Sequence, residues 1–502
     1  MSRPDQAGGA PRGVTRLSAD PAADAVAAAM TPVARRRRPD ALGLLVAYVL
    51  LVLLLPSRLV LSGISFNITP ALLLALGLGL WWGCAQLTST LGAAKGRNPV
   101  RTAFFLFLLA NIASYGYAAW GWLPGDELKS ADRSLIYIVG VILAGIVVVD
   151  GIRSRETLDR LLLASVGATA TVAVIGLLQF FANIDIAGFV SAQLPGLRPQ
   201  TSLDFILRRS IFRRPAGTTG HPIEFGVLMA MVLPLALHFA FRASELALPH
   251  RPRRAPGMTE KPAPGPEWLR LRPLLARRWF YVLVIAMSTA VSVSRSAILG
   301  VMVAAFVLVP TWPRRRRLRA LWVTLFFVVA MRAVVPGLIG TIFSLFRNLG
   351  GDPSVQGRTD DYANASKQID AHPWLGRGFG TYLPERYGAL DNQYLGSLVE
   401  TGIIGVSTFA LVMLTSVYTA AAARRVSTDP VLRDQAACLM AATVVVMVGS
   451  ITYDQLGFAM STGLAFVLFG ASGALYRLTK SAHTDRLPAD RRTGSRRRAR
   501  SG

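Results

Sequence analysis

Cysteine and charged side chains are both scarce in this chain of 502 residues. Its two cysteines, Cys84 and Cys438, lie inside apolar stretches. A disulfide framework, a cysteine-based zinc site and an iron–sulfur cluster all need more thiols, so the sequence disfavours all three. Charged residues make up only 16% of the chain. That proportion is too low for a set of ordinary soluble domains.

Apolar residues are abundant instead, at 52% of the chain with a mean hydropathy of +0.43. They form blocks of mostly about 17 to 25 residues, long enough to cross roughly 30 Å of hydrocarbon. The blocks fall at 40–60, 68–88, 102–123, 135–151, 160–182, 223–242, 279–293, 295–312, 320–340, 394–423, 435–453 and 456–476. We therefore predict an all-α polytopic integral membrane protein with about 12 transmembrane helices.

The two ends of the chain are basic and lack apolar blocks. Residues 1–39 are rich in Ala, Pro, Gly and Arg, which indicates a disordered tail and not a signal peptide. Residues 477–502 are predicted to form a second such tail, and residues 40–476 a single membrane domain. Most Lys and Arg residues fall on the cytoplasmic side if the N-terminus is inside, so the positive-inside rule predicts that both termini are cytoplasmic.

Acidic residues are outnumbered, with 28 Asp and Glu against 54 Lys and Arg and a net charge of +26. Such an excess is also typical of nucleic-acid-binding proteins. Here the basic runs lack interleaved aromatic residues and any recognisable nucleic-acid-binding fold. We therefore expect no nucleic-acid partner and interpret these runs as topology anchors beside anionic membrane lipid.

Two connections that face outward are long, at 183–222 and at 341–392, the second directly before span ten. Loops of this length are usually lids or binding surfaces when they are not disordered. In the second loop, residues 359–371 are predicted to form a helix with Tyr362, Ala365 and Ile369 on one face. His372 and Pro373 would end it, and the glycines that follow indicate a sharp turn.

The spans themselves are nearly free of charge, which weighs against a proton-coupled carrier but not against a lipid flippase. Arginines gather outside instead: Arg213 and Arg214 lie in the first loop, and Arg295 lies between spans seven and eight. Positive charge outside opposes the insertion bias, so this pattern suggests an anionic partner there. Planar guanidinium groups suit phosphate, and two or three could neutralise a departing diphosphate.

Two residues of the second loop could accept or donate a proton. His372 precedes a proline at a predicted helix end, where a histidine is also favoured by the helix dipole. Asp391 lies directly before span ten and could equally be the N-cap of that helix. Both alternatives stay open on the residues alone.

Three segments together resemble the O-antigen ligase and polymerase superfamily of polytopic membrane glycosyltransferases. The first has Arg214, Gly217, His221 and Pro222 leading into span six, and the second is Ser294-Arg295-Ser296. The third is the most specific. It contains Arg358, Tyr362, Ile369, His372, Pro373, Leu375, Gly376, Gly378, Gly380, Asn392, Tyr394, Leu395, Glu400, Gly402 and Gly405. Each segment is weak alone, and their order and spacing carry the resemblance over residues 160 to 420.

The resemblance implies an enzyme of the bacterial cytoplasmic membrane that transfers a glycan from undecaprenyl diphosphate to an acceptor hydroxyl on the outer face. The donor would be a polyprenyl-diphosphate-linked glycan and the acceptor a glycan or glycolipid, as in an O-antigen ligase or a polysaccharide polymerase. The transfer would be inverting, without metal or other cofactor. Arg214 and Arg295 would bind the diphosphate. Arg213, Arg358, Arg377 and Tyr394 lie in the same segments and are further substrate-binding candidates.

The catalytic base is where the sequence departs from the family, which usually has His before the Asn of its Asn-x-Tyr-Leu motif. Here that residue is Asp391, which can also serve as a base, and His372 is the substitute. A different class of function, a lipid-linked oligosaccharide flippase, is the alternative. It would keep its arginines in a central cavity and would not need a large outer loop ending in a carboxylate.

Overall fold

The structure is a computed structural model. It describes residues 41–63, 66–88, 96–121, 123–200, 207–209, 212–247, 266–347, 362 and 365–486. The long helices are α2 (Ala41–Leu54), α3 (Pro70–Leu87), α4 (Pro99–Trp120), α5 (Gly125–Gly151), α6 (Arg155–Phe181), α8 (Pro222–Ala247), α9 (Pro266–Val291), α10 (Arg295–Leu308), α11 (Arg314–Val334), α15 (Gln393–Val426), α16 (Pro430–Gly449) and α17 (Ala459–Arg486).

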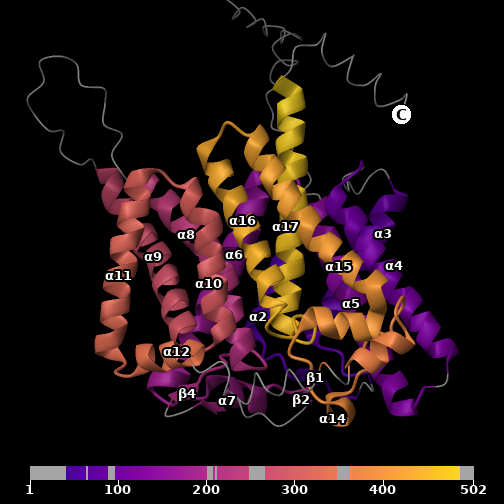
Figure 1. The fold of residues 1–502 in the computed structure, drawn as a ribbon. Coiled ribbons are helices and arrows are strands. Elements are labelled where there is room, and N and C mark those ends of the chain that lie inside the picture. The colour runs from indigo at the N-terminus through magenta and orange to yellow at the C-terminus, as the bar shows by residue number, and fades with distance from the viewer. Residues whose placement is uncertain are drawn as a thin grey trace, which may run out of the picture. The chain divides into compact units, whose positions relative to one another are not determined.

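Shorter elements connect these helices (Figure 1). They are α7 (Ile186–Gln193), the 3₁₀ turn η1 (Val309–Thr311), α12 (Leu338–Arg347) and α14 (Pro384–Tyr387). Two small antiparallel pairs join them, β1 (Leu59–Leu61) with β2 (Leu197–Pro199) and β3 (Leu207–Arg209) with β4 (Phe212–Arg214). The strands, α7 and α14 lie at one end of the helices, the lower end in Figure 1.

The predicted helical membrane architecture is confirmed. Within the described residues, nine helices are long and apolar enough to cross a membrane. Helix α2 and the segment 295–311 are apolar but shorter, and α11 begins with the four arginines Arg314–Arg317. Each predicted block therefore contains a helix, while the number of twelve crossings stays a prediction, as does the placement of the loops on the outer side.

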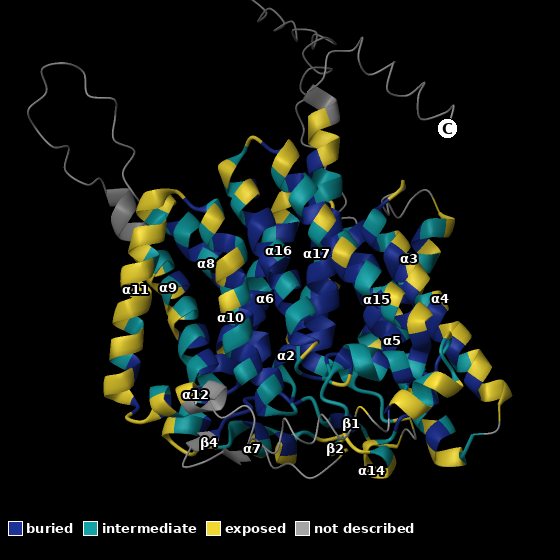
Figure 2. Cartoon of the chain, viewed as in Figure 1, coloured by how far each residue is buried: buried dark blue, intermediate teal, exposed yellow. Residues whose placement is uncertain are grey.

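The core is built around α8 and α17, which are buried over most of their length (Figure 2). Small residues let α17 approach α5 closely: a Cβ atom on Gly470 would lie 2.5 Å from the main-chain oxygen of Gly145. Close backbone contact of this kind is the usual way in which membrane helices pack. Helix α11 lies at the edge, with Met331 as its only buried residue among those described.

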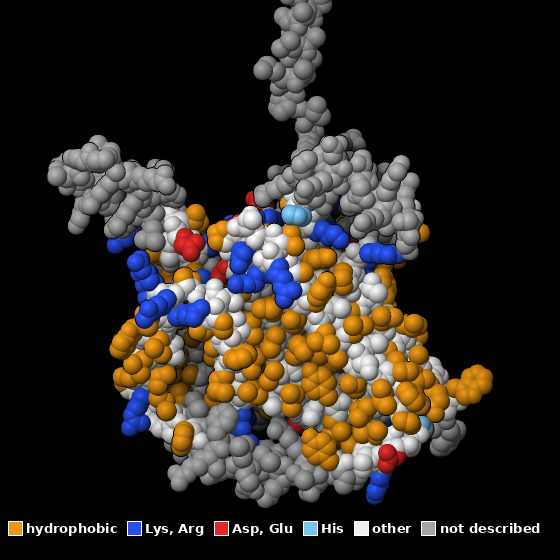
Figure 3. Space-filling model, turned by 45° about the horizontal axis from the view of Figure 1, so that its top comes forward, with side chains coloured by type: hydrophobic (Ala, Val, Ile, Leu, Met, Phe, Trp, Pro, Cys, Tyr) orange, Lys and Arg blue, Asp and Glu red, His pale blue; other side chains and the backbone are white. Residues whose placement is uncertain are grey.

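The outer surface has the composition of a membrane-spanning protein. On the face shown in Figure 3, hydrophobic side chains cover the middle band, and Lys and Arg side chains gather along the end that is tilted toward the viewer. Apolar side chains that face lipid need no partner, whereas cations are stable beside headgroups.

The predicted helix in the second long loop is confirmed in part. Residues 365–371 are helical, while Thr359 and its neighbours lie outside the described residues. Ala365 and Ile369 pack with Tyr382 and Val399, as expected for one apolar face. Tyr362, predicted on the same face, is instead 49% exposed.

Candidate functional site

Arg214 ends strand β4 and is buried, with 7% of the residue exposed. Its Nε donates to the main-chain oxygen of Ser292 at 3.1 Å. Ser292 lies in the short turn between α9 and α10, and α10 begins with Arg295. The bond therefore ties the first long loop to the turn that carries Arg295. Val293 within this turn has φ of 47°, a conformation that a β-branched residue adopts only under strain.

The turn after Arg214 is clamped by Gln179 of α6, a residue that the sequence analysis did not select. The Oε1 atom of Gln179 accepts the N–H groups of Ala216 at 3.2 Å and Gly217 at 2.7 Å, and its Nε2 donates to the oxygen of Gly217 at 3.1 Å. Gly217 has φ of +61°, and a Cβ there would lie 3.0 Å from the oxygen of Val172. Glycine is therefore required at this position.

The same turn is joined to the end of α2, which brings a further cation to the site. The Nη2 atom of Arg58 donates to the oxygen of Gly220 at 2.5 Å, and the N–H of Ser57 donates to the oxygen of Thr218 at 3.0 Å. Sequence reasoning missed Arg58. The sequence did contain a signal for it. Arg58 lies at the predicted outer end of span one, where the positive-inside rule disfavours arginine, as it does at Arg214.

His221 lies among these charges. Burial, together with the cations Arg214 and Arg58, lowers the pKa of His221 to about 4, and Asp391 opposes this shift. Its Nδ1 accepts the main-chain N–H of Ile223 at 3.2 Å. An imidazole that accepts at Nδ1 is neutral with its proton on Nε2, so His221 offers an N–H donor at neutral pH.

The carboxylate of Glu224, in the first turn of α8, holds the start of α17 against this turn. Its Oε1 accepts the N–H groups of Met460 at 2.9 Å and Ser461 at 3.1 Å, and its Oε2 accepts the N–H of Gly220 at 2.8 Å. A carboxylate at a helix N-terminus is stabilised by the free N–H groups there. Glu224 thus fixes the segment that leads to His221.

Asp391 is not the N-cap of α15, contrary to the structural role considered for it from sequence. The cap is Asn392, whose side-chain oxygen accepts the N–H groups of Tyr394 at 3.0 Å and Leu395 at 3.3 Å. The next residue, Gln393, binds the turn between α16 and α17 through Ser450 and Leu456. Asp391 therefore lies beside this turn, and the N-cap of α15 is provided by Asn392.

The turn between α16 and α17 connects Asp391 with α10. The hydroxyl of Thr452 donates to that of Ser296 at 2.8 Å, next to Arg295. Burial and the nearby Asp391 raise the pKa of Asp454 in this turn to about 6. We call Arg58, Arg214, His221, Arg295 and Asp391 the arginine cluster. These residues lie in strand β4 and near the ends of α2, α8, α10 and α15. Main-chain and side-chain hydrogen bonds join the segments that carry them.

The glycines of the second long loop lie where the main chain of this loop packs directly against the main chain of α15. Helix α15 is broken at Gly402, where φ is 65° and ψ is −167°. The loop pairs with the break: Arg377 and Gly378 donate to the oxygens of Val399 and Glu400. A Cβ on Gly376 would lie 2.3 Å from the carbonyl carbon of Glu400. The sharp turn predicted from these glycines is thus explained by close main-chain contact.

His372 lies in a cavity of about 490 Å³ that is lined by residues of α4, α5 and the second loop. Its Nδ1 is 3.3 Å from the hydroxyl of Tyr117. Arg377 lines the same cavity, but its Nη2 pairs with Glu127 at 2.5 Å and its guanidinium lies over the ring of Tyr387. Glu127 is fully buried, so this ion pair anchors the loop to α5 and occupies Arg377.

The remaining predicted substrate residues are only partly described. Arg358 lies outside the described residues, and the side chain of Arg213 is not described, although its main chain pairs with Arg208 in the strands β3 and β4. The hydroxyl of Tyr394 donates to the oxygen of Met447 at 2.8 Å, which commits its proton to α16. Contact of these residues with substrate stays a prediction.

Residues 280–410 match the family model described as O-antigen ligase. The matched region contains Arg295, His372, Asp391 and the glycine crossing, whereas Arg214 and His221 precede it. A search of curated proteins found no match. The chain therefore carries the domain of the O-antigen ligases, a family of membrane glycosyltransferases.

Proposed function

Given an O-antigen ligase domain over residues 280–410, which implies lipid-linked glycan transfer, we propose that the arginine cluster transfers a glycan from a polyprenyl diphosphate to an acceptor hydroxyl on the outer face of the bacterial cytoplasmic membrane. The transfer is inverting and uses no metal. The observation that carries this proposal is that hydrogen bonds hold together the segments that bear Arg58, Arg214, Arg295 and Asp391, next to His221. The cluster combines cations for a leaving group with a carboxylate that can take up a proton.

In this mechanism the arginines stabilise the leaving diphosphate. The acceptor oxygen attacks the anomeric carbon, the bond from that carbon to the diphosphate oxygen breaks, and the electron pair leaves with the diphosphate. Arg214 and Arg295 bind its oxygens, and Arg58 and the neutral Nε2–H of His221 add donors. Charge-assisted donors placed where charge develops accelerate such a step most.

Asp391 takes the proton of the acceptor hydroxyl in the same step. Because Asn392 already satisfies the end of α15, Asp391 can change its protonation state without disturbing that helix. A single displacement at the anomeric carbon inverts its configuration. His372 lies instead in the cavity beside Tyr117 and Glu127, a position suited to the acceptor glycan, and it is the second candidate for the base.

Purified protein in lipid nanodiscs, given a synthetic polyprenyl-diphosphate oligosaccharide and a glycan acceptor, tests the proposal. We expect a transfer product with inverted anomeric configuration that forms equally in the presence of EDTA. Mass spectrometry and NMR of the product measure both points.

The flippase alternative is tested with the same lipid in sealed liposomes. Movement of the intact lipid across the bilayer without any product would contradict glycan transfer and favour a flippase. Product formation that stops with EDTA would overturn only the metal-independent mechanism.

A further inference from the structure

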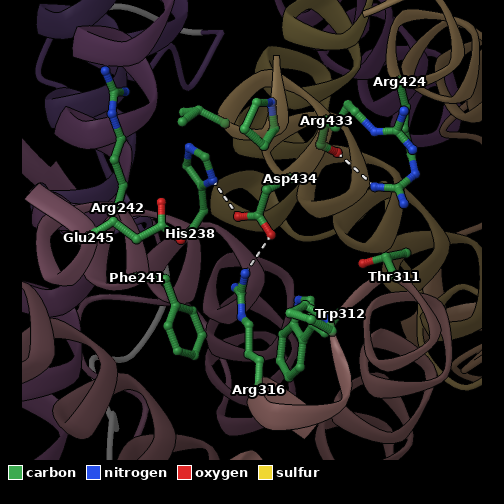
Figure 4. Close-up of a pocket in the computed structure, with 13 residues that line it drawn as sticks. His238, Phe241, Arg242, Glu245, Thr311, Trp312, Arg316, Arg424, Arg433 and Asp434 are labelled. Carbon is green, nitrogen blue, oxygen red and sulfur yellow. Dashed lines mark hydrogen bonds and ion pairs between the residues drawn. The ribbon is translucent and has the colours of Figure 1, made fainter. Parts of the chain in front are cut away.

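A second polar cavity lies at the opposite end of the helices from the arginine cluster. Its volume is about 290 Å³. Helix α8 begins at the arginine cluster with Pro222, and the cavity lies some four turns further along it, from His238 onward. The other walls come from the link between α10 and α11, the end of α15 and the start of α16 (Figure 4).

Arg316 is fixed at the base of this cavity. Its Nη1 donates to Asp434 Oδ1 at 2.9 Å, and its guanidinium carbon lies 3.6 Å from the ring centre of Phe241 and 4.5 Å from that of Trp312. An arginine held between two rings and a carboxylate has little conformational freedom left to lose. It is therefore already oriented for a ligand.

Several buried polar atoms of the cavity wall have no hydrogen-bond partner among the described residues. They are Nε and Nη2 of Arg316, Nε1 of Trp312 and Nε2 of His238. Trp312 is 6% exposed and His238 is 1% exposed. Arg and Trp side chains can only donate, and a buried donor left unsatisfied costs about 1 to 3 kcal/mol. Three of the four atoms thus need an acceptor that the described part of the chain does not supply.

The charge of the lining favours an anionic acceptor. Four arginines face two carboxylates, Asp434 and Glu245; the arginines are Arg242, Arg316, Arg424 and Arg433. Asp434 is already shared between Arg316 and His238, as Figure 4 shows. Arg242 pairs with Asp159, which does not line the cavity, and this leaves Arg424 and Arg433 on the opposite wall.

A metal ion is the competing ligand, because ligand atoms of His238, Asp434 and Cys438 lie within 4.8 Å of one another. Both oxygens of Asp434 already accept hydrogen bonds, from His238 at 2.7 Å and from Arg316 at 2.9 Å. A guanidinium bound to the same carboxylate also repels a second cation. The geometry therefore fits an anion better.

We propose that this cavity binds a phosphate group, supplied either by the headgroup of an anionic phospholipid or by a soluble phosphate compound. Tetrahedral phosphate oxygens match the fork of Arg316, and Trp312 Nε1 can donate to a further oxygen. On the predicted topology this end of the helices faces the cytoplasm, where basic pockets between membrane helices receive such headgroups. The site is independent of the proposed glycan transfer.

Delipidated full-length protein tests the proposal by native mass spectrometry, with phosphatidylglycerol, cardiolipin and phosphatidylcholine as probes. Inorganic phosphate is tested separately by thermal shift. The variant is Arg424→Gln with Arg433→Gln, which removes two charges from the lining. The control is Arg315→Gln with Arg319→Gln, which removes two exposed charges from α11 that do not line the cavity. Trp312→Phe keeps an aromatic ring at this position but removes the unpartnered N–H.

We expect wild type and control to retain anionic lipid and the cavity variant to lose about tenfold in affinity, as expected for one lost charge-assisted hydrogen bond. Trp312→Phe should weaken the same binding. Lipid retention without a response to inorganic phosphate identifies a headgroup as the ligand, and the reverse pattern identifies a soluble phosphate. Equal binding of every probe by wild type, cavity variant and Trp312→Phe would overturn the proposal.

Discussion

Arg214 donates to the main-chain oxygen of Ser292, 78 residues further along the chain. The bond couples the position of Arg214 to the turn that carries Arg295, and both arginines are predicted to bind phosphate. Because Gln179 fixes the following turn from a third helix, the cluster is set by the packing of helices and not by a flexible loop. Fixed donors of this kind are what stabilisation of a leaving group requires.

Replacing arginine by lysine in the cluster tests bidentate phosphate binding. We expect Arg214→Lys and Arg295→Lys each to lower kcat/KM for the lipid-linked donor by about tenfold or more, because lysine keeps the charge but loses the fork that grips two oxygens. Steady-state kinetics in nanodiscs measure this loss.

The matched control for these variants is Arg198→Lys, in strand β2 at the same end of the helices, where the side chain is exposed and bonds Asn67. It should transfer normally. Thermal unfolding separates lost binding from lost structure, since Arg214→Lys also removes the bond to Ser292. Wild-type transfer by both cluster variants would contradict a role for these arginines in diphosphate binding.

His221 gives the protein a pH-dependent stability with a defined sign. Its pKa is about 4 in the folded protein against 6.5 for an ordinary histidine, because burial and the neighbouring arginines disfavour the imidazolium. As the pH falls, His221 therefore takes up a proton in the unfolded chain before it does so in the folded protein. The stability that comes from keeping His221 neutral is complete above pH 6.5 and is lost as the pH falls toward 4.

The variant His221→Asn isolates that contribution. We expect the difference in melting temperature between wild type and His221→Asn to shrink as the pH falls from 7 to 4.5. Asp454 has the opposite effect, since its pKa is raised to about 6, so the comparison has to be made between the two proteins and not within one. A difference that stays constant over this range would show that His221 is not held neutral.

Long apolar blocks predict the helices well, because the membrane leaves the backbone no alternative to internal hydrogen bonds. Where a helix breaks inside such a block is harder to predict. Gly402 interrupts α15 within a continuous apolar stretch, and only the loop at Pro373–Gly378, which bonds the exposed main-chain groups, makes the break stable. The loop contacts the break in space, but no sequence pattern around Gly402 indicates that contact.

The candidate site was predictable where a residue violates a general rule. Arg214 and Arg295 stand out because cations on the outer side oppose the insertion bias. Gln179 and Glu224 do not stand out, since their task is to hold main-chain atoms of distant segments. The ion pair of Arg377 is hidden for a related reason: its buried partner Glu127 lies 250 residues away, so the pair cannot be recognised from sequence.

The crossing of Gly376 and Gly402 predicts a strong loss of stability for an added methyl group. A Cβ on Gly402 would lie 2.4 Å from the main chain of Trp374, and its φ is positive. We expect Gly402→Ala to lower the free energy of unfolding by about 2 kcal/mol or more. Gly396→Ala, in the same helix with nothing within 4 Å of the new methyl group, should be neutral or slightly stabilising. Equal melting temperatures for the two variants would contradict the crossing.

The placement of the arginine cluster outside the cell membrane is tested by cysteine labelling. In a background of Cys84→Ser and Cys438→Ala, Asp370→Cys and Glu385→Cys lie at the end that carries the cluster, and Arg315→Cys lies at the other end. We expect a membrane-impermeant maleimide to label the first two in intact cells and the third only after lysis. Labelling of Arg315→Cys alone in intact cells would place the arginine cluster inside and rule out transfer on the outer face.

Asp391 can be tested as a base by a substitution that leaves the N-cap of α15 in place, because Asn392 provides that cap. Asp391→Asn removes the ability to accept a proton while keeping size and polarity. We expect normal insertion and an intact α15, with kcat lowered by roughly 10² to 10⁴, the usual cost of losing a general base.

The contrasting variant is Asn392→Ala, which removes the two bonds to Tyr394 and Leu395 and should cost about 1 kcal/mol of stability, as loss of an N-cap does. Asp391→His, which places the usual residue of the family at this position, should keep partial activity, since imidazole can also accept the proton. Asp391→Asn is expected to lower the rate and Asn392→Ala to lower the stability. The assignment of Asp391 as the base therefore does not depend on a single variant. Near-normal transfer by Asp391→Asn would contradict it and move the search for the base to His372, beside Tyr117.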